Sequence, residues 1–125
     1  MPKALSNFAC FAVLLSLGAC SAISLTLPVA VVSKDIPGGI LRGTTTAKAN
    51  GEGSFNVSNG RLSCGGTYNS LDQSLTISIP ILCNDGRKGI IIATRDYSGT
   101  SGGGHFTLND GATGDFMFGE AAGKL

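Results

Sequence analysis

The sequence predicts an all-β fold: a small antiparallel meander of seven or eight strands that forms a sandwich or a closed small barrel, preceded by a helical signal peptide. Three observations lead to this prediction. Glycine is abundant, with 19 residues among 125, and no G-X-Y period accompanies it, which excludes collagen. Short stretches alternate apolar and polar residues, as half-buried strands do. Asn-Gly and Asp-Gly pairs separate several of these stretches and indicate hairpin turns.

The composition fits one folded domain rather than a disordered chain. Hydrophobic residues make up 42% of the sequence and the net charge is +1, whereas disordered chains combine low hydrophobicity with high net charge. Nine Lys and Arg residues balance eight Asp and Glu residues. Because nucleic-acid-binding proteins carry basic patches, we expect no nucleic-acid partner.

Residues 1–19 have the three parts of a secretory signal peptide. Lys3 supplies the positive charge, residues 8–17 are apolar, and the small residues Gly18 and Ala19 precede the predicted cleavage site. The apolar run is too short to cross a hydrocarbon core of about 30 Å as a helix. We therefore predict a signal peptide at 1–19, followed by a short tether at 20–24 and a small β domain at 25–125.

Leu17-Gly18-Ala19-Cys20 resembles the lipobox of bacterial lipoproteins. The resemblance implies that the leader is cut before Cys20, that Cys20 receives a diacylglyceryl group on its sulfur, and that the new amino terminus is acylated. Residues 20–24 would then form a lipidated tether. Ser21 stands where many inner-membrane lipoproteins have Asp, which implies an outer-membrane location. The alternative is a secreted protein that is cut after Ala19 or Ala22.

The first two predicted strands span residues 25–32 and 40–49, with a Pro- and Gly-rich turn at 34–39 between them. Pro28 has no backbone N–H, so the first strand either lies at a sheet edge or begins after Pro28.

The clearest predicted hairpin turns at Asn59-Gly60. A two-residue type I′ turn, which needs positive φ at both central residues, pairs Ser58 with Arg61. The alternation then places four side chains on one face, which we expect to be the core face: Phe55, Val57, Leu62 and Cys64.

The second half of the chain contains a repeated turn motif. Residues 75–83 alternate as a strand, with Pro80 indicating an exposed edge or a bulge. Asn84-Asp85-Gly86-x-x-Gly89 then recurs as Asn109-Asp110-Gly111-x-x-Gly114. We predict Gly89 and Gly114 to be bulges in the left-handed region. The remaining predictions are a Gly-rich connection at 98–104 and strands at 90–95, 105–108 and 115–118, with Ile91 and Ala93 facing inward.

Residues 40–119 also resemble small uncharacterised envelope lipoproteins of bacteria. The resemblance rests on a Gly-x-Gly-x-Phe strand, on Cys83-x-Asp85-Gly86-Arg87-x-Gly89, and on the ending Phe116-Met117-Phe118-Gly119. It implies no activity.

Cys64 and Cys83 fall on predicted core faces, and in an exported protein such a pair favours a disulfide. Closing a loop of about 20 residues stabilises by roughly 3 kcal/mol in the chain-entropy model. The alternative, a metal site, lacks a CxxC spacing or a His cluster. Cys10 belongs to the leader.

The remaining polar candidates favour structural roles. His105 is the single histidine, and we expect an exposed strand residue, because a general base needs a nucleophile and an orienting group nearby. Asp85 and Asp110 are predicted turn formers, with a paired-carboxylate site as the alternative. Three cations could meet on the surface, although a solvated face is the preferred interpretation: Arg87, Lys88 and Arg95.

These observations predict no catalytic residues, no cofactor and no metal site. We expect a non-enzymatic, membrane-anchored envelope lipoprotein with a structural or protein-interaction role. Its partners would be the membrane, through the lipid anchor, and an envelope protein. The alternative is a small-ligand-binding or inhibitor β domain of the periplasm. A large apolar pocket would favour ligand binding, whereas a solid core with an exposed apolar patch would favour protein interaction.

Overall fold

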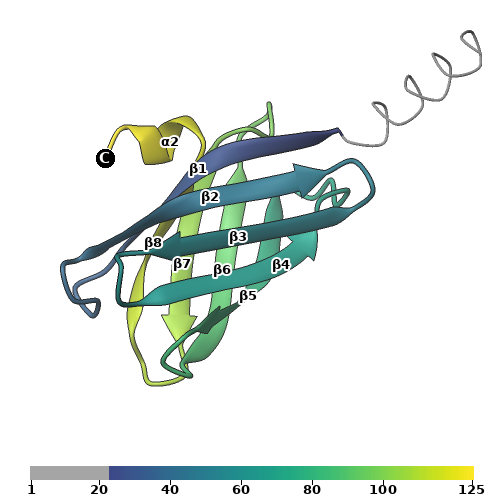
Figure 1. The fold of residues 1–125 in the computed structure, drawn as a ribbon. Coiled ribbons are helices and arrows are strands. Elements are labelled where there is room, and N and C mark those ends of the chain that lie inside the picture. Colours follow the sequence, from purple (N-terminus) through teal and green to yellow (C-terminus); the bar gives the residue numbers. More distant parts are fainter. Residues whose placement is uncertain (1–22) are drawn as a thin grey trace, which may run out of the picture.

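The computed structural model describes residues 23–125, so the predicted signal peptide, Cys10 and Cys20 lie outside the described part. Its eight antiparallel strands form a closed barrel in which each strand pairs with the next and β8 pairs with β1 (Figure 1). The predicted all-β meander is confirmed, and of its two forms the barrel is the one observed. The elements are β1 (Ser24–Val32), β2 (Ile40–Lys48), β3 (Glu52–Ser58), β4 (Ser63–Asn69), β5 (Thr76–Cys83), β6 (Lys88–Arg95), β7 (Gly102–Leu108), β8 (Thr113–Phe118) and α2 (Glu120–Gly123).

Two of the strand pairings are short and divide the barrel into halves. Strands β4 and β5 share only two residue pairs, and β1 and β8 share four. We call these the β4–β5 seam and the β1–β8 seam. The other neighbouring strands share six to nine pairs each. In Figure 1 the strands of the β1–β4 half cross those of the β5–β8 half steeply.

A proline lies at each seam, because a residue without an N–H cannot continue the ladder. The Pro28 carbonyl accepts a 2.8 Å hydrogen bond from the Gly119 N–H, just beyond the last β1–β8 pair. The Pro80 carbonyl faces β4, where a Cβ added to Gly66 would lie 2.1 Å from it. Strand β1 begins at Ser24, so the alternative that this strand begins after Pro28 is wrong. Strand β1 pairs with both β2 and β8, so it is not an edge strand either, although Pro28 lies beyond its last pair with β8.

The barrel has a closed end and an open end. Four connections form the closed end, at residues 33–39, 59–62, 84–87 and 109–112. Side chains from three of them are buried beneath it: Ile36, Leu62 and Ala112.

The open end, which we call the mouth, is formed by the start of β1 and the connections 49–51, 70–75 and 96–101. The core lies inside the barrel between the two ends. Its buried side chains come from all eight strands: Val29, Val31, Leu41, Phe55, Val57, Cys64, Ile79, Ile81, Cys83, Ile91, Ala93, Phe106, Leu108, Phe116 and Phe118.

The β3–β4 hairpin differs from the prediction by two residues. Ser58 pairs with Ser63 rather than with Arg61, so the loop has four residues, 59–62. Among these residues only Gly60 has positive φ, whereas a type I′ turn needs two such residues. The Asn59 side-chain oxygen instead accepts the backbone N–H groups of Arg61 and Leu62. A shift of two residues keeps the same face inward, so the predicted core face is confirmed.

The two repeated turns place their left-handed glycine earlier than predicted. Gly86 and Gly111 have φ of 90° and 88°, while Gly89 and Gly114 have no positive φ and lie in strands. The Gly111 N–H donates to the Leu108 carbonyl, and the Leu108 N–H donates to the Ala112 carbonyl, which closes a three-residue loop. The predicted bulges at Gly89 and Gly114 are therefore wrong, although the odd loop length still turns Phe106 and Phe116 inward.

Two further expectations concern the last third of the chain. Ile91 and Ala93 are buried, as predicted. The Gly-rich connection is shorter than expected, because residues 102–104 belong to β7 and pair with both β6 and β8. Their small size suits this close pairing, since a Cβ on Gly104 would lie 1.8 Å from the Ile92 carbonyl oxygen.

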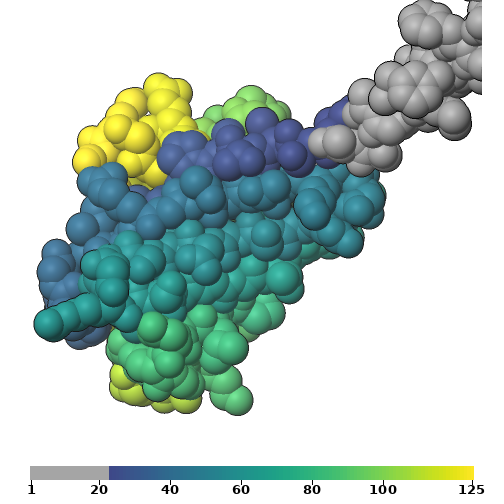
Figure 2. Space-filling view, viewed as in Figure 1, coloured from purple at the N-terminus to yellow at the C-terminus, as the bar shows by residue number. Residues whose placement is uncertain are grey.

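The chain ends in α2, a single helical turn. Figures 1 and 2 show it (yellow) against the outer side of β1, where Ala122 is buried. The Arg42 guanidinium donates a 2.7 Å hydrogen bond to the Leu125 carbonyl and so holds the end of the chain against β2. No helix within residues 23–125 has the length and apolar character needed to cross a bilayer.

Candidate functional site

A cavity of about 180 Å³ lies inside the barrel at the mouth. Small side chains at Ala47 and Ala93 leave this space in front of the rings of Phe55 and Phe116. The lining is mostly apolar and comes from β1 to β6, from β8 and from the connections 70–75 and 96–101: Leu25, Leu27, Thr45, Ala47, Phe55, Tyr68, Asn69, Ser70, Ile77, Ile79, Ala93, Arg95, Gly99, Phe116 and Phe118.

The polar atoms inside the cavity already have partners. Thr45 Oγ1 donates to the Ser54 carbonyl at 2.9 Å and lies 2.6 Å from Tyr68 Oη. At the entrance, Arg95 Nη2 donates to the carbonyls of Asp72, at 2.6 Å, and of Ser74. Because these groups are satisfied within the protein, the cavity suits an apolar guest better than a charged one.

Five exposed apolar side chains lie at the mouth, and we call them the mouth rim. Ile23 and Leu25 belong to the first residues of the described chain, Leu71 and Leu75 to the connection 70–75, and Tyr97 to the connection 96–101. Leu71, Leu75 and Tyr97 line one shallow surface depression. The mouth rim was not predictable from the sequence, because its residues come together only when the barrel closes.

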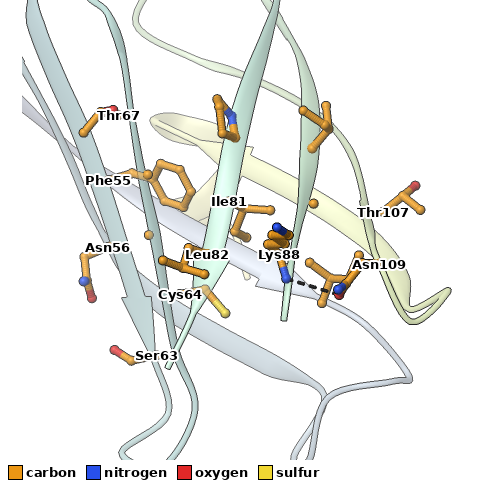
Figure 3. Close-up of a pocket in the computed structure, with 16 residues that line it drawn as sticks. Phe55, Asn56, Ser63, Cys64, Thr67, Ile81, Leu82, Lys88, Thr107 and Asn109 are labelled. Carbon is orange, nitrogen blue, oxygen red and sulfur yellow. Dashed lines mark hydrogen bonds between the residues drawn. The ribbon is translucent and has the colours of Figure 1, made fainter. Parts of the chain in front are cut away.

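A second apolar region lies on the outside of the barrel, and we call it the outer hollow. Pro80, Leu82 and Ile90 expose apolar surface there, and neighbouring glycines at 65, 66 and 89 leave it concave. Figure 3 shows Leu82 between polar borders, which are formed on one side by Asn56 and Thr67 and on the other by Thr107 and Asn109. Ile92, next along the outer face of β6, is also exposed.

The predicted cysteine pair lies at the β4–β5 seam. Cys64 and Cys83 are directly paired, and their Sγ atoms are 2.02 Å apart, which confirms a cysteine pair at disulfide distance. Both side chains are buried in the core. Cys20, the predicted lipidation site, lies outside the described residues.

His105 lies on the outer face of β7, as predicted. Its Nδ1 is 2.9 Å from Asp115 Oδ1 across the β7–β8 ladder, and the two side chains are 84% and 60% exposed. A general base works where water is excluded and a nucleophile lies within reach. The pair therefore has the geometry of a surface contact.

Asp85 and Asp110 form turns, as predicted. Asp85 Oδ1 accepts the Arg87 N–H, and Asp110 Oδ1 accepts the Ala112 N–H. These backbone hydrogen bonds hold the pKa of each carboxyl below its ordinary value, with a further lowering by the Arg87 guanidinium. Because Arg87 bridges the carboxylates at 2.9 and 3.3 Å, they do not form a paired acid–base site.

The cations Arg87 and Arg95 do not meet, because they lie at opposite ends of β6. Lys88 is exposed beside Arg87. Within residues 23–125, no group of three or more His, Cys, Asp or Glu side chains is arranged to hold a metal ion.

The chain matches no protein-family model, no curated protein and no solved structure. Its function is therefore inferred from the geometry of its own residues.

Proposed function

We propose that this protein is an exported envelope lipoprotein, anchored through Cys20 to the outer membrane, that acts by binding another envelope protein rather than by catalysis. The observation that carries the proposal is the Cys64–Cys83 pair. A buried cysteine pair at disulfide distance is typical of proteins that fold in an oxidising compartment outside the cytoplasm. It supports the interpretation of residues 1–19 as an export signal.

The outer hollow supports a role in protein contact. Leu82 is 61% exposed and Ile90 is 45% exposed, whereas their inward-facing neighbours Ile81 and Ile91 are buried. Exposed apolar patches bordered by polar residues are typical of protein-interaction surfaces.

The cavity at the mouth favours a second function, the binding of a small apolar ligand. Its volume of about 180 Å³ is comparable to an engineered apolar cavity of about 150 Å³ that binds benzene. It is smaller than the roughly 300–1,000 Å³ typical of sites for drug-sized ligands. The first function is therefore preferred, and the second is limited to small guests.

The anchor is tested by metabolic labelling with an alkyne fatty acid. Cys20→Ala should abolish the label and release the protein from the membrane fraction, because Cys20 carries the acyl chains. Cys10→Ala, which changes the other leader cysteine, should keep both the label and the membrane location. Equal labelling of the Cys20→Ala protein would contradict the proposal.

The contact role is tested by photo-crosslinking in intact cells. A benzophenone amino acid at Ile90 should form a discrete adduct with another envelope protein, because Ile90 lines the outer hollow. The matched control is Thr44, which is exposed on the outer face of β2 and should form no such adduct. Identical adduct patterns from the two positions would contradict a specific role for the outer hollow.

A further inference from the structure

The exposed apolar side chains of this protein are concentrated at one end of the barrel. Single exposed apolar residues are normal on soluble proteins, so their clustering is the informative feature. Among residues 23–125, nine large apolar side chains are exposed, and five of them form the mouth rim. Those five are Ile23 (63%), Leu25 (47%), Leu71 (58%), Leu75 (52%) and Tyr97 (99%).

The loops that carry the mouth rim are held in place by hydrogen bonds. The Ser70 N–H donates to the Gly51 carbonyl at 3.0 Å, and Arg95 binds two carbonyls of the connection 70–75. In the connection 96–101, Asp96 Oδ1 accepts the Gly99 N–H at 3.0 Å. Leu71, Leu75 and Tyr97 are therefore presented by ordered turns instead of folding back over the cavity.

The residues that precede the described chain join it at this same end. Ile23, the first described residue, is part of the mouth rim, and its carbonyl accepts the Ala49 N–H of the connection 49–51. Three residue steps separate Ile23 from Cys20, a span of at most about 11 Å at the length of an extended chain. A lipid on Cys20 would therefore bring the mouth rim, rather than the closed end, next to the bilayer.

The charges around the mouth are mixed rather than basic. Lys48 pairs with Glu52 at 3.3 Å, and the carboxylates of Asp72 and Asp96 accept hydrogen bonds within their own turns. A surface of this kind offers no electrostatic attraction to anionic lipids, so apolar contact has to supply the adhesion. Tyr97 suits such a place, because tyrosine rings favour the boundary between lipid and water.

We propose that the mouth rim is a membrane-contact surface, and that the barrel rests on the lipid bilayer with its mouth toward the acyl chains. The orientation rests on the proposed anchor at Cys20, whereas the apolar contact stands on the mouth rim itself. In this orientation the cavity opens toward the bilayer, so an apolar guest can pass between lipid and cavity without crossing water. The outer hollow, on the side of the barrel, stays free for a protein partner.

The test uses the tyrosine fluorescence of the full chain, purified from membranes and reconstituted with phosphatidylcholine vesicles. The chain has two tyrosines and no tryptophan, so Tyr68 and Tyr97 account for the emission. Vesicles whose acyl chains carry bromine near the headgroup quench only rings that reach the membrane boundary. The Tyr68→Phe protein, which reports Tyr97 alone, should be quenched. The Tyr97→Phe protein, which reports the inward-facing Tyr68, should be quenched much less.

Paired variants connect the quenching to the mouth rim. Leu71→Ser with Leu75→Ser should remove most of the Tyr97 quenching, because the apolar contact is lost. Leu82→Ser with Ile90→Ser changes two similarly exposed residues of the outer hollow and should leave the quenching unchanged. The circular dichroism spectrum of each variant establishes that the barrel is folded.

The outcomes separate this inference from the proposed anchor, whose presence is read independently from the mass of the purified protein. A lipidated protein that stays with the vesicles but shows no Tyr97 quenching overturns the membrane-contact surface and leaves the anchor standing. If the mass shows no covalent lipid on the protein and Tyr97 is still quenched, the membrane-contact surface is supported and the anchor is overturned. Quenching that depends on Leu82 and Ile90 rather than on Leu71 and Leu75 overturns the proposed orientation.

Discussion

Several glycines lie inside the strands because an aromatic ring from a neighbouring strand occupies the space of a side chain. At Gly114, an added Cβ would lie 2.5 Å from Phe106 Cε1 and 2.4 Å from the Val32 carbonyl oxygen. Contacts this short require the ring or the backbone to move. The same relation recurs at three other positions, where the glycine and ring pairs are Gly53 with Tyr68, Gly66 with Phe55, and Gly102 with Phe118.

We therefore expect Gly114→Ala to lower the free energy of unfolding by about 1–3 kcal/mol, the typical cost of overpacking a core. The measurement is the urea midpoint at neutral pH. Gly123→Ala is the matched control, because nothing lies within 4 Å of its added Cβ and its φ is not positive. Its stability should stay equal or rise slightly, as alanine restricts the unfolded chain. Equal midpoints for the two variants would contradict this account of the barrel glycines.

At the scale of the elements, the two repeated turns are joined by one guanidinium. Arg87 contacts Asp85 within its own turn and Asp110 in the β7–β8 turn. Backbone N–H donors and Arg87 favour the ionised carboxylates, so the pKa of each is lower in the folded protein than in the unfolded chain. A lowered folded pKa gives stability that is complete above the unfolded value, near 3.9, and is lost as the pH falls through the folded value.

We expect the unfolding free energy to fall as the pH drops below about 4, where these carboxylates gain protons. The double variant Asp85→Asn, Asp110→Asn should lose less stability between pH 7 and pH 3, because asparagine keeps the turn acceptor without the charge. Urea midpoints at the two pH values measure the difference. In the double variant the unfolding free energy should still fall with pH, but less steeply, since the pKa of Asp72 and Asp96 is lowered as well. An unchanged acid dependence in the double variant would exclude this explanation.

The strands themselves were predictable, because alternation fixes which side chains face the core. Turn geometry was less predictable. At Asn59-Gly60 the sequence signal favoured a two-residue turn, but a longer loop lets Leu62 reach the buried closed end and lets Asn59 bind two N–H groups. Both registers keep Phe55 and Val57 inward, so local alternation could not distinguish them.

At the scale of the whole molecule, the two short seams are the weakest pairings of the barrel. Of these two, only the β4–β5 seam has a covalent link. Beyond the Cys64–Cys83 and Gly65–Leu82 pairs, that seam has no further ladder. The two cysteines are 19 residues apart in sequence. A link between them restricts the unfolded chain and joins the two barrel halves where hydrogen bonding is weakest.

Reduction with dithiothreitol should therefore lower the unfolding free energy by about 3 kcal/mol. Hydrogen exchange in β4 and β5 should accelerate more than in β2 and β3, whose ladder has six residue pairs. The double variant Cys64→Ala, Cys83→Ala, treated with the same reductant, should show no further change. Equal stability of the oxidised and reduced protein would mean that the cysteine pair does not support the seam.

The candidate site was less predictable than the fold. The cysteine pair was predictable, because both cysteines fall at core-facing positions of their strands. The mouth cavity was not, because it depends on where strands from the two halves of the barrel diverge. The mouth rim joins residues as distant in sequence as Leu25 and Tyr97, and no local pattern in either segment indicates the other. Sequence patterns therefore did not predict the mouth cavity or the mouth rim, because both depend on how the connections meet after the barrel closes.

The pairing of β1 with β8 also determines the order in which the molecule can assemble. The other pairings join neighbours along the chain and can form as soon as both strands are available, whereas β1–β8 pairing joins nearly the two ends of the chain and has the largest loop-closure entropy. During synthesis the first strand must wait for the last one. Until β8 has been made, Val29 and Val31 lack their β8 partners and stay exposed to aggregation.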